Sequence, residues 1–475
     1  MNRRAKIIAT LGPASSDKKT IKKLIQAGVN VVRINFSHGT HREHAEAINK
    51  VRGVAEELGQ PVTILQDLQG PKIRVGEIQD GQIHIKAGDE LSLTTEQIIG
   101  NHEYISVDYP YLPQSARVGG RILLDDGNLE LRIEKVKTNS IKTRVIMGGL
   151  LKSHKGVNLP GAKLEIQSFT SKDREDLAFG LSKNVDAIAL SFVRSDQDII
   201  NLREEIKKID ETKSAIPIIA KLERPEALEE LHKIIHVSDG VMVARGDLGV
   251  ELPPENVPTE QKRIINMANH HLKLVITATQ MLESMMNNPR PTRAEASDVA
   301  NAIFDGSDLV MLSGETAVGN FPIKAVDTMS AIICEAEKHA TEWGHFDTGL
   351  IDDLSHEEAF YITRAARELA YSRDVAGIAV FTISGHTARV MSKVRPRVPI
   401  LAFTPNENTY NKLALSWGVE PYIVPHSETV ESMLDQVKRV ISESTKLQPG
   451  QEVVLIAGFP IGAMRSANFL LLHEV

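Results

Sequence analysis

Short apolar runs separated by amphipathic helical patterns recur along most of the chain. Eight of these runs are rich in β-branched residues, are too short for a core helix, and are each followed by a helical pattern. They span 6–12, 29–37, 62–68, 186–192, 216–223, 239–247, 273–280 and 308–315. Eight alternating βα units predict an α/β fold, the (β/α)8 TIM barrel, with eight parallel strands inside a ring of helices.

Polar and charged residues stand where these predicted strands end. The carboxyl ends of the strands form the active face of such a barrel. The residues expected on that face are Arg33, Asn35, Ser37, Asp67, Lys221, Glu223, Arg245, Asp247, Thr279, Ser313 and Glu315. Packing does not explain charges at so many strand ends, so the pattern predicts a functional site that could hold phosphate and metal.

The pattern changes between residues 70 and 168. Helical periodicity disappears, and short strands alternate with turn dipeptides such as Asp-Gly at 80–81 and Gly-Gly at 119–120. This predicts a small all-β domain inserted after the third barrel strand. Because that loop lies on the active face, the insert is expected to act as a lid that excludes water. A passive decoration is the alternative.

The barrel is therefore assigned to 1–69 and 169–343, and the lid to 70–168. Residues 344–355 are expected to form a linker. The region 356–475 again alternates helices and strands and is predicted to be a separate α/β domain with its own core.

Composition narrows the classes of function. The 475 residues fit roughly three domains. A net charge of −7 argues against a general nucleic-acid surface, which needs a basic patch. The single cysteine, Cys334, has no internal disulfide partner, and a packing role in a helix is expected. No signal-peptide core or membrane-length apolar run is present, so a cytoplasmic protein without a membrane partner is expected.

The segment 221–223 carries the strongest chemical signal. Lys221 and Glu223 share one face of their strand, and the next strand ends near Asp247. Two carboxylates about 4 Å apart repel by roughly 1–4 kcal/mol, which a divalent cation relieves. Oxygen ligands without nearby His or Cys favour magnesium or manganese over zinc. The alternative is a structural ion network in which Lys221 and Arg245 pair with these acids.

A phosphate is expected beside this cluster. Lys221 is a compact cation of the kind that contacts a phosphoryl group in transfer, and Arg33 and Arg74 could add charge. Arg74 could instead anchor the lid. A lone Thr279 or Ser313 at a strand end is ordinarily a turn or cap residue, but near Glu315 and a metal each becomes a candidate for positioning or proton relay.

Two loops could bind anions. The segment 35–44 opens a helix, whose start could receive a nucleotide phosphate; its histidines at 38, 41 and 44 fit a solvated face better than a metal site. The segment 382–388 joins a strand to a helix and offers hydroxyl and N–H groups, with ordinary capping as the alternative. The segment 458–468 could close over the same ligand.

Taken together, these segments resemble the pyruvate kinase family. The matching motifs are KIIATLGPAS, VVRINFSHGTH, IPIIAKLERPEAL, DGVMVARGDLGVELP, ITATQMLESM, NPRPTRAEASDVANAIFDGSDLVMLSGETAVG and TISGHTA. They cover all three predicted domains in the family order, and the resemblance is to members without an appended C-terminal domain. It implies phosphoryl transfer from phosphoenolpyruvate to ADP, giving pyruvate and ATP, by a homotetramer.

The resemblance also implies roles for individual residues. Glu223 and Asp247 match the magnesium ligands, for which manganese can substitute, and Lys221 matches the cation that stabilises the transferred phosphoryl group. Thr279 matches a threonine that helps to protonate the enolate, with Ser313 and Glu315 as an associated relay. The remaining matches are Arg33 for the phosphate, Ala244, Arg245, Gly246 and Asp247 for the substrate carboxylate, and Asn35, His38 and Arg74 for the nucleotide.

The segment DLQGPKIR at 67–74 departs from a common family pattern, DTKGPEIR. Lys72 stands at the acidic position and Leu68 replaces threonine, a pairing that in the family marks potassium-independent members. The Lys72 ammonium is expected to occupy the field of the monovalent ion beside Asp67, Asn35 and Ser37. A second departure is Ser195, where some relatives carry lysine, which leaves the nucleotide contact there open.

The resemblance further implies an allosteric site at Thr382, Ser384, Gly385, His386 and Thr387. No obvious basic or tryptophan contact is available for a second phosphate, so a monophosphate such as ribose 5-phosphate, glucose 6-phosphate or AMP is expected. Two rival functions remain open. One is another barrel enzyme of phosphoenolpyruvate or pyruvate chemistry, such as a metal-dependent lyase, and the other is a catalytically silent effector-binding homologue.

Overall fold

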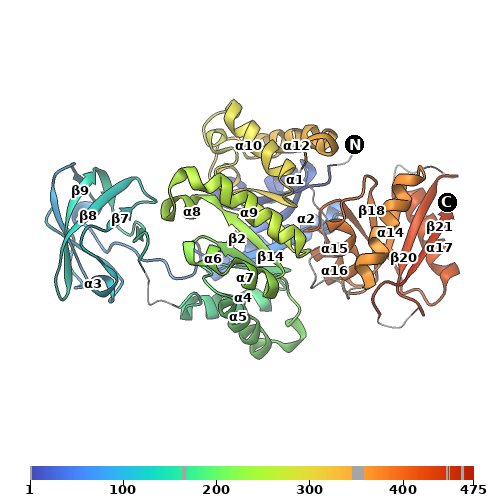
Figure 1. Ribbon diagram of the computed structural model, residues 1–475, viewed down its shortest axis with the longest axis horizontal. Helices are drawn as coiled ribbons and strands as arrows, with labels where there is room; N and C mark the ends of the chain where they lie inside the picture. Colours follow the sequence, from blue (N-terminus) through green and yellow to red (C-terminus); the bar gives the residue numbers. More distant parts are fainter. Residues whose placement is uncertain (1–2, 163–166, 345–357, 445–447, 449, 462–464) are drawn as a thin grey trace.

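The computed structural model describes residues 3–162, 167–344, 358–444, 448, 450–461 and 465–475. Three bodies follow one another along its longest axis, with the β domain at one end, the barrel in the centre and the C-terminal domain at the other end (Figure 1). The predicted linker at 344–355 falls almost entirely outside the described residues. In the part of the chain that is described, no helix has the length and apolar character needed to cross a bilayer.

Each of the eight predicted runs forms one strand of a closed parallel barrel, which confirms the predicted fold class. Around the barrel the strands are β1 (Lys6–Thr10), β2 (Val29–Asn35), β3 (Thr63–Asp67), β12 (Ala187–Leu190), β13 (Ile218–Leu222), β14 (Gly240–Ala244), β15 (Leu274–Ala278) and β16 (Leu309–Leu312). Most of their side chains are fully buried because one face of each strand fills the interior and the other packs under the helices.

Helices cover the outside of the barrel. The longer ones are α1 (Lys18–Gln26), α2 (His41–Leu58), α4 (Ser171–Ser182), α5 (Asp196–Ile209), α7 (Leu231–Val237), α9 (Val257–His270), α10 (Arg293–Phe304) and α12 (Pro322–Lys338). Four helices are short. Three of them begin close to the end of a barrel strand: α6 (Pro225–Glu229), α8 (Arg245–Glu251) and α11 (Gly314–Ala317). The fourth, α13 (Ala340–Trp343), follows the longer helix α12. Cys334 lies within α12 as a half-buried free thiol, consistent with the expected packing role.

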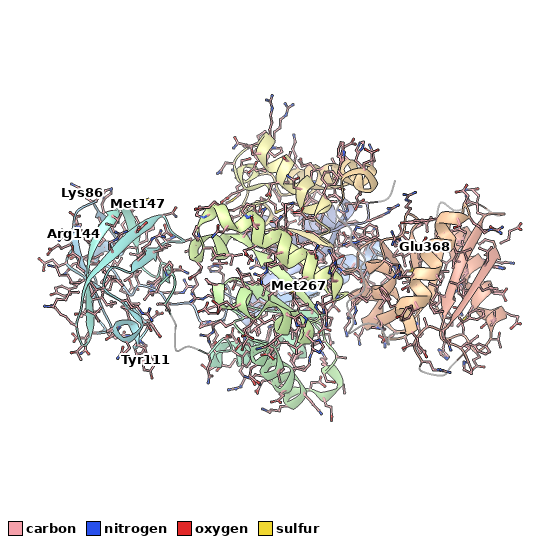
Figure 2. The ribbon with its side chains drawn as sticks, viewed as in Figure 1. Lys86, Tyr111, Arg144, Met147, Met267 and Glu368 are labelled. Carbon is pink, nitrogen blue, oxygen red and sulfur yellow. The ribbon has the colours of Figure 1, made fainter. Side chains whose placement is uncertain are left out.

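The inserted domain is built from two sheets around its own apolar core. One sheet pairs β4 (Gln82–Ile85) with β10 (Gly149–Lys152). The other contains β5 (Glu90–Thr94), β6 (Tyr104–Ser106), β7 (Arg121–Leu124), β8 (Leu129–Val136), β9 (Ser140–Met147) and β11 (Val157–Asn158). A single-turn helix, α3 (Leu112–Ser115), was not predicted. Tyr111 and Met147 are about half exposed and project from the outside of this domain (Figure 2).

The C-terminal domain is a five-stranded sheet in the order β19-β18-β17-β20-β21. Its elements are α14 (Glu358–Ser372), β17 (Gly377–Phe381), α15 (His386–Lys393), β18 (Ile400–Thr404), α16 (Glu407–Leu413), β19 (Val419–Ile423), α17 (Val430–Ser444), β20 (Glu452–Ala457) and β21 (Phe469–Glu474). The edge strand β21 runs antiparallel to β20 and was not predicted. Glu368 of α14 is exposed on this domain (Figure 2).

Acidic residues just before three barrel strands close the face opposite the predicted site. Asp186, Asp239 and Asp308 each accept a hydrogen bond from a backbone N–H near the start of the neighbouring strand, at 2.7, 3.0 and 2.8 Å; the donors are Ile64, Ile218 and Val275. The C-terminal domain binds the last of them, because Lys393 and Arg395 at the end of α15 lie 2.6 and 2.7 Å from the Asp308 carboxylate. A buried ion cluster therefore joins this domain to the barrel.

Candidate active site

Lys221, near the end of β13, is the centre of the polar cluster at the carboxyl ends of the strands. Its ammonium donates to Ser191 Oγ at 2.6 Å and lies 2.9 Å from Glu223 Oε1 and 3.2 Å from Asp67 Oδ1. The two carboxylates outweigh the effect of burial and raise the pKa of Lys221 above its ordinary value. The lysine is therefore a fixed, permanently charged group on the active face.

Glu223 lies beside Lys221, and the negative charge of Asp247 acts on both of them. Glu223 is buried, and its Oε2 accepts a hydrogen bond of 2.7 Å from the backbone N–H of Phe192. Burial raises the pKa of Glu223 to about 7; Lys221 opposes this rise and the negative charge of Asp247 adds to it. The sequence predicted that these two acids come close to each other, and β13 and β14, the strands that they follow, are paired neighbours in the barrel.

The donor set fits a magnesium ion. The negative charge of Asp247 helps to raise the pKa of Glu223, and a divalent cation between the two carboxylates would remove that repulsion. The described residues contain no cluster of three or more His, Cys, Asp or Glu side chains suited to a metal. This suits Mg²⁺, which is commonly bound through one or two carboxylates together with water and substrate phosphate oxygens.

Arg33 and Asp67 form the second part of the cluster, at the ends of β2 and β3. Arg33 Nε lies 2.6 Å from Asp67 Oδ2, and its Nη1 donates to Thr10 Oγ1 at 3.1 Å. Burial would raise the pKa of Asp67, but Lys221 and Arg33 together lower it below its ordinary value. The side chain of Asp67 therefore holds both cations in place from one buried position.

The loop after β2 adds Asn35, Ser37 and His38. Asn35 Oδ1 accepts a hydrogen bond of 3.1 Å from the backbone N–H of Ser37 and so shapes the turn. Burial and then the charges of Arg74, Lys72 and Arg33 lower the pKa of His38. The positive charges of Arg74, Lys72 and Arg33 all act on His38, which makes this side of the site suitable for an anion.

Arg74 and Lys72 enter from the first connection to the inserted domain. The backbone N–H of Arg74 donates to Asp108 at 2.6 Å, and its guanidinium donates to the carbonyl of His154 at 3.0 Å. These contacts support the alternative that Arg74 anchors the lid. Among the described residues, Lys72 makes no hydrogen bond or ion pair with Asp67, Asn35 or Ser37; it lines a 40 Å³ cavity shared by the inserted domain and Asp247. Leu68 is buried.

Thr279 follows β15 with a backbone φ of +68°, a region that β-branched residues rarely adopt. Its Oγ1 accepts from the backbone N–H of Gly246 at 2.7 Å and donates to the carbonyl of Ala278 at 2.6 Å. Strain of this kind is common at functional sites. The hydroxyl is therefore held in one orientation at the end of its strand.

Ser313 and Glu315 follow β16. Glu315 accepts backbone hydrogen bonds from Leu282 at 3.0 Å and Ser313 at 2.8 Å, and burial raises its pKa. In the described structure the buried Ser313 Oγ has no hydrogen-bond partner. Neither side chain hydrogen-bonds to Thr279, so the predicted relay is not formed directly in this structure.

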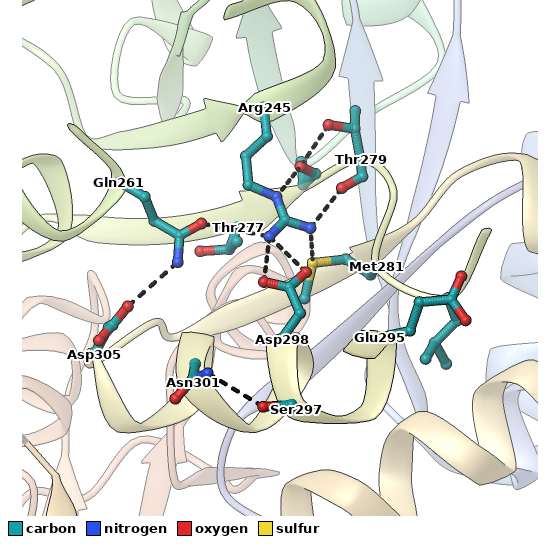
Figure 3. Close-up of polar contacts among 12 residues, drawn as sticks. Arg245, Gln261, Thr277, Thr279, Met281, Glu295, Ser297, Asp298, Asn301 and Asp305 are labelled. Carbon is teal, nitrogen blue, oxygen red and sulfur yellow. Dashed lines mark hydrogen bonds and ion pairs between the residues drawn. The ribbon is translucent and has the colours of Figure 1, made fainter. Parts of the chain in front are cut away.

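Arg245 begins α8, immediately after Ala244 at the end of β14, and its side chain is committed to protein partners (Figure 3). Its Nη1 lies 2.7 and 2.6 Å from the two carboxylate oxygens of Asp298, and its Nη2 donates to the carbonyl of Thr279 at 2.7 Å. Among the described residues Arg245 pairs with Asp298 of α10 and not with Glu223 or Asp247, so it takes no part in the structural ion network considered as the alternative.

Two site residues escaped the sequence analysis. Ser191 Oγ accepts from Lys221 and donates to the carbonyl of Leu68 at 2.7 Å, while the Phe192 backbone adopts a φ of +56° and holds Glu223. The signal that could have identified Ser191 was a polar residue immediately before the end of the fourth apolar run. Phe192 acts through its backbone, so its side-chain type carried no signal.

The predicted anion loop of the C-terminal domain borders a cavity of 330 Å³. Thr382, Ser384, His386 and Thr387 line it, and Arg465 lies on the facing segment. Thr382 Oγ1 accepts the backbone N–H of Gly385 at 3.0 Å, and Gly385 adopts a φ of +86° that suits glycine. The structure therefore brings the five predicted residues to one pocket or its turn.

Comparisons with known proteins cover almost the whole chain. Residues 2–326 match the pyruvate kinase barrel domain, and 361–473 match the pyruvate kinase alpha/beta domain. The chain is 44% identical over 481 residues to a pyruvate kinase of Geobacillus stearothermophilus, covering all of this chain and 81% of the relative. It is 42% identical to a pyruvate kinase of Mycobacterium tuberculosis, covering all of this chain and 99% of the relative.

A solved structure agrees with these sequence matches. The crystal structure of a pyruvate kinase from Cryptosporidium parvum superposes with a TM-score of 0.91 at 35% identity, covering 99% of this chain and 96% of the other. Fold, site geometry and sequence similarity lead to one conclusion: the chain belongs to the pyruvate kinase family and is a phosphotransferase.

Proposed function

We propose that this chain transfers the phosphoryl group of phosphoenolpyruvate to ADP at the cluster around Lys221. The contact of Lys221 with Glu223 at 2.9 Å, beside Asp247, carries the proposal because it combines a fixed cation with two metal-suited carboxylates. Phosphoryl transfer depends on positioned charge more than on covalent chemistry. Glu223 and Asp247 would hold magnesium, or manganese in its place, and the ion would neutralise charge on the transferring group.

The other roles follow from position. Arg33 would contact the phosphate, and the turn from Ala244 through Gly246 would receive the substrate carboxylate. Thr279 would supply or relay the proton that the enolate takes up at carbon. Its rigid hydroxyl supports this role. Ser313 and Glu315 would act behind it, with Glu315 as a brace of the backbone.

On the nucleotide side we propose Asn35 and His38, with Arg74 as a further contact. The cations that act on His38 support an anion there. Ser195 serves as the N-cap of α5, where its backbone N–H donates to Asp198 at 3.0 Å. Because Ser195 stands where some relatives carry lysine, the nucleotide preference is tested by comparing activity with ADP, GDP and other diphosphates.

Potassium independence is part of the proposal. Lys72 carries the positive charge that a monovalent ion would otherwise bring, and its influence on His38 supports its reach towards the loop after β2. Lys72 would have to form its contacts with Asp67, Asn35 and Ser37 when the substrates are bound.

Allosteric activation by a monophosphate is the second proposed property of the chain. The cavity beside Thr382 and Ser384 supports it, and α15 provides a connection to the barrel. This helix begins at His386 beside the cavity, and Lys393 at its end binds Asp308 at the start of β16. Arg465 is the one lysine or arginine among the described residues that line the cavity, which favours a single phosphate.

We also propose a cytoplasmic homotetramer and the three-domain division 1–69 with 169–343, 70–168, and 356–475. The end of β3 at Asp67 and the start of α4 at Ser171 support the barrel boundaries. Light scattering during size-exclusion chromatography tests the assembly.

The first experiment is pyruvate formation from phosphoenolpyruvate, ADP and magnesium in buffer free of potassium, sodium and ammonium. Turnover in this buffer supports both the reaction and the role of Lys72. Turnover only after potassium is added retains the reaction and refutes the Lys72 proposal. Absence of turnover in both buffers, with or without a monophosphate, favours the silent homologue.

A further inference from the structure

The first two turns of α4 contain two buried carboxylates, Asp173 and Asp176, on a helix that borders the rim of the barrel (Figure 1). This helix begins where the chain returns from the inserted domain. Buried acids are rare unless they are paired, so the partners of these two side chains identify what the helix holds.

Asp173 binds both connections between the barrel and the inserted domain. Its Oδ2 accepts from the backbone N–H of Thr170 at 2.9 Å and from Thr170 Oγ1 at 2.6 Å. Its Oδ1 accepts from the backbone N–H of Gly70 at 3.1 Å. An acid at this helical position ordinarily bonds only its own N-cap residue. Here the second oxygen holds the outgoing connection, 103 residues earlier in the sequence.

Gly70 is confined from its other side as well. It adopts a φ of +68°, and a Cβ at this position would lie 2.9 Å from Phe192 Cδ2 and 3.0 Å from Ser191 Cβ. Ser191 hydrogen-bonds to Lys221, and Phe192 holds Glu223. The outgoing connection is therefore packed between the Asp173 carboxylate and the residues that fix the catalytic cluster.

Two other side chains in the first two turns of α4 hold the loop after β2. Lys172 Nζ donates to the carbonyl of Phe36 at 2.8 Å, and Asp176 lies 2.7 Å from His41 Nε2. The His41 ring stacks on Phe179 of the same helix, with centroids 4.3 Å apart and planes 8° from parallel. One helix thus contacts both connections of the inserted domain and both ends of the 36–41 loop.

We propose that α4 couples the lid connections to the nucleotide-side loop, with Asp173 as a positioning residue and Lys172 and Asp176 as its link to that loop. The coupling rests on the proposed nucleotide contacts of Asn35 and His38. A nucleotide that orders the loop after β2 would thereby restrict the hinge of the lid. Lid closure would then follow nucleotide binding without a direct contact between the nucleotide and the hinge.

Kinetics of Asp173→Asn give the first test. We expect kcat to fall about tenfold or more, with KM for phosphoenolpyruvate changed less than about threefold, because closure is impaired while the barrel contacts remain. The matched control is Asp198→Asn, which has the same place in α5 and caps Arg194 and Ser195 without contacting either connection. Equal kinetic effects of the two substitutions at equal thermal stability would overturn the proposal.

Hydrogen exchange gives a second test that does not require Asp173→Asn to fold. Mg-ADP should protect the amides of 36–44 and of 167–171 in the wild type, and Lys172→Gln should abolish the second protection while the first is retained. If Mg-ADP protects 36–44 but leaves 167–171 unchanged in the wild type, the coupling is refuted. If it does not protect 36–44, the proposed nucleotide contacts are wrong instead.

Discussion

The hydroxyl of Thr279 accepts a 2.7 Å hydrogen bond from the backbone N–H of Gly246, so the end of β15 is locked to the first turn of α8. The same hydroxyl donates to the carbonyl of Ala278. The Thr279 hydroxyl thereby connects the end of β15 to the turn after β14. This turn, which contains Gly246, is the one that we propose receives the substrate carboxylate.

Replacing this hydroxyl tests its proposed part in enolate protonation. Thr279→Ala is expected to lower kcat about 100-fold or more, while KM for phosphoenolpyruvate changes little, because a placed proton donor acts in the chemical step. Thr279→Ser keeps the hydroxyl and should retain activity within about tenfold of the wild type. Steady-state kinetics with parallel melting curves measure both, and equal loss in the two variants would argue for a purely structural threonine.

Metal affinity should depend on pH through Glu223. Its folded-state pKa of about 7 lies above the ordinary value of 4.5, so without metal this residue lowers stability as pH rises between these values. At pH values below both the folded-state and the ordinary pKa, Glu223 is protonated in both states and no longer affects the stability. Binding of Mn²⁺ should weaken up to about tenfold for each pH unit below 7, because the proton competes with the cation. Calorimetric titrations at several pH values measure this, and Glu223→Gln should remove the dependence along with most of the affinity.

Lys72 should determine the monovalent-cation requirement. Lys72→Glu is expected to lower activity in potassium-free buffer at least about tenfold and to regain it with added potassium, because a carboxylate needs the cation that the ammonium replaces. The double variant with Leu68→Thr should show the effect most clearly. Lys86→Glu, an exposed charge reversal on the inserted domain, is the control. Full activity of Lys72→Glu without potassium would refute the assignment.

Arg245 should contribute to stability through Asp298. Arg245→Met leaves a partly buried carboxylate without its cation and is expected to lower the free energy of unfolding by about 3 kcal/mol. Arg263→Met removes the more exposed ion pair with Glu260 and should cost less than about 1 kcal/mol. Denaturant titrations of both variants measure the difference. A loss of substrate affinity in Arg245→Met without loss of stability would instead support a direct substrate contact.

The effector pocket should select a monophosphate. Ribose 5-phosphate, glucose 6-phosphate or AMP is expected to shift the phosphoenolpyruvate saturation curve of the wild type, and Ser384→Asp should abolish this shift by charge repulsion with the phosphate. Ser442→Asp introduces the same charge on exposed α17 and should leave the shift intact. A response to fructose 1,6-bisphosphate alone would show that the expected effector class is wrong.

Much of the fold was predictable because its signals are local. Each barrel strand is an apolar run flanked by a helical pattern, and the turn dipeptides of the inserted domain mark its short strands. The edge strand β21 was missed, because the loop signals of 458–468 masked the short run behind it and its pairing with β20 is long-range. The partner of Arg245 was not predicted for a similar reason, since Asp298 lies 53 residues away.

Local patterns in the chain specify the order of strands, the inserted domain and the residue types at the strand ends, because alternation and turn chemistry act over a few residues. Which of these groups come into contact depends on how the elements pack in three dimensions. Closure of the barrel brings Asp67 from β3 to Lys221 on β13 and places Gly70 against Asp173. Contacts of this kind depend on the packing of whole elements, so no local pattern in the chain could specify them.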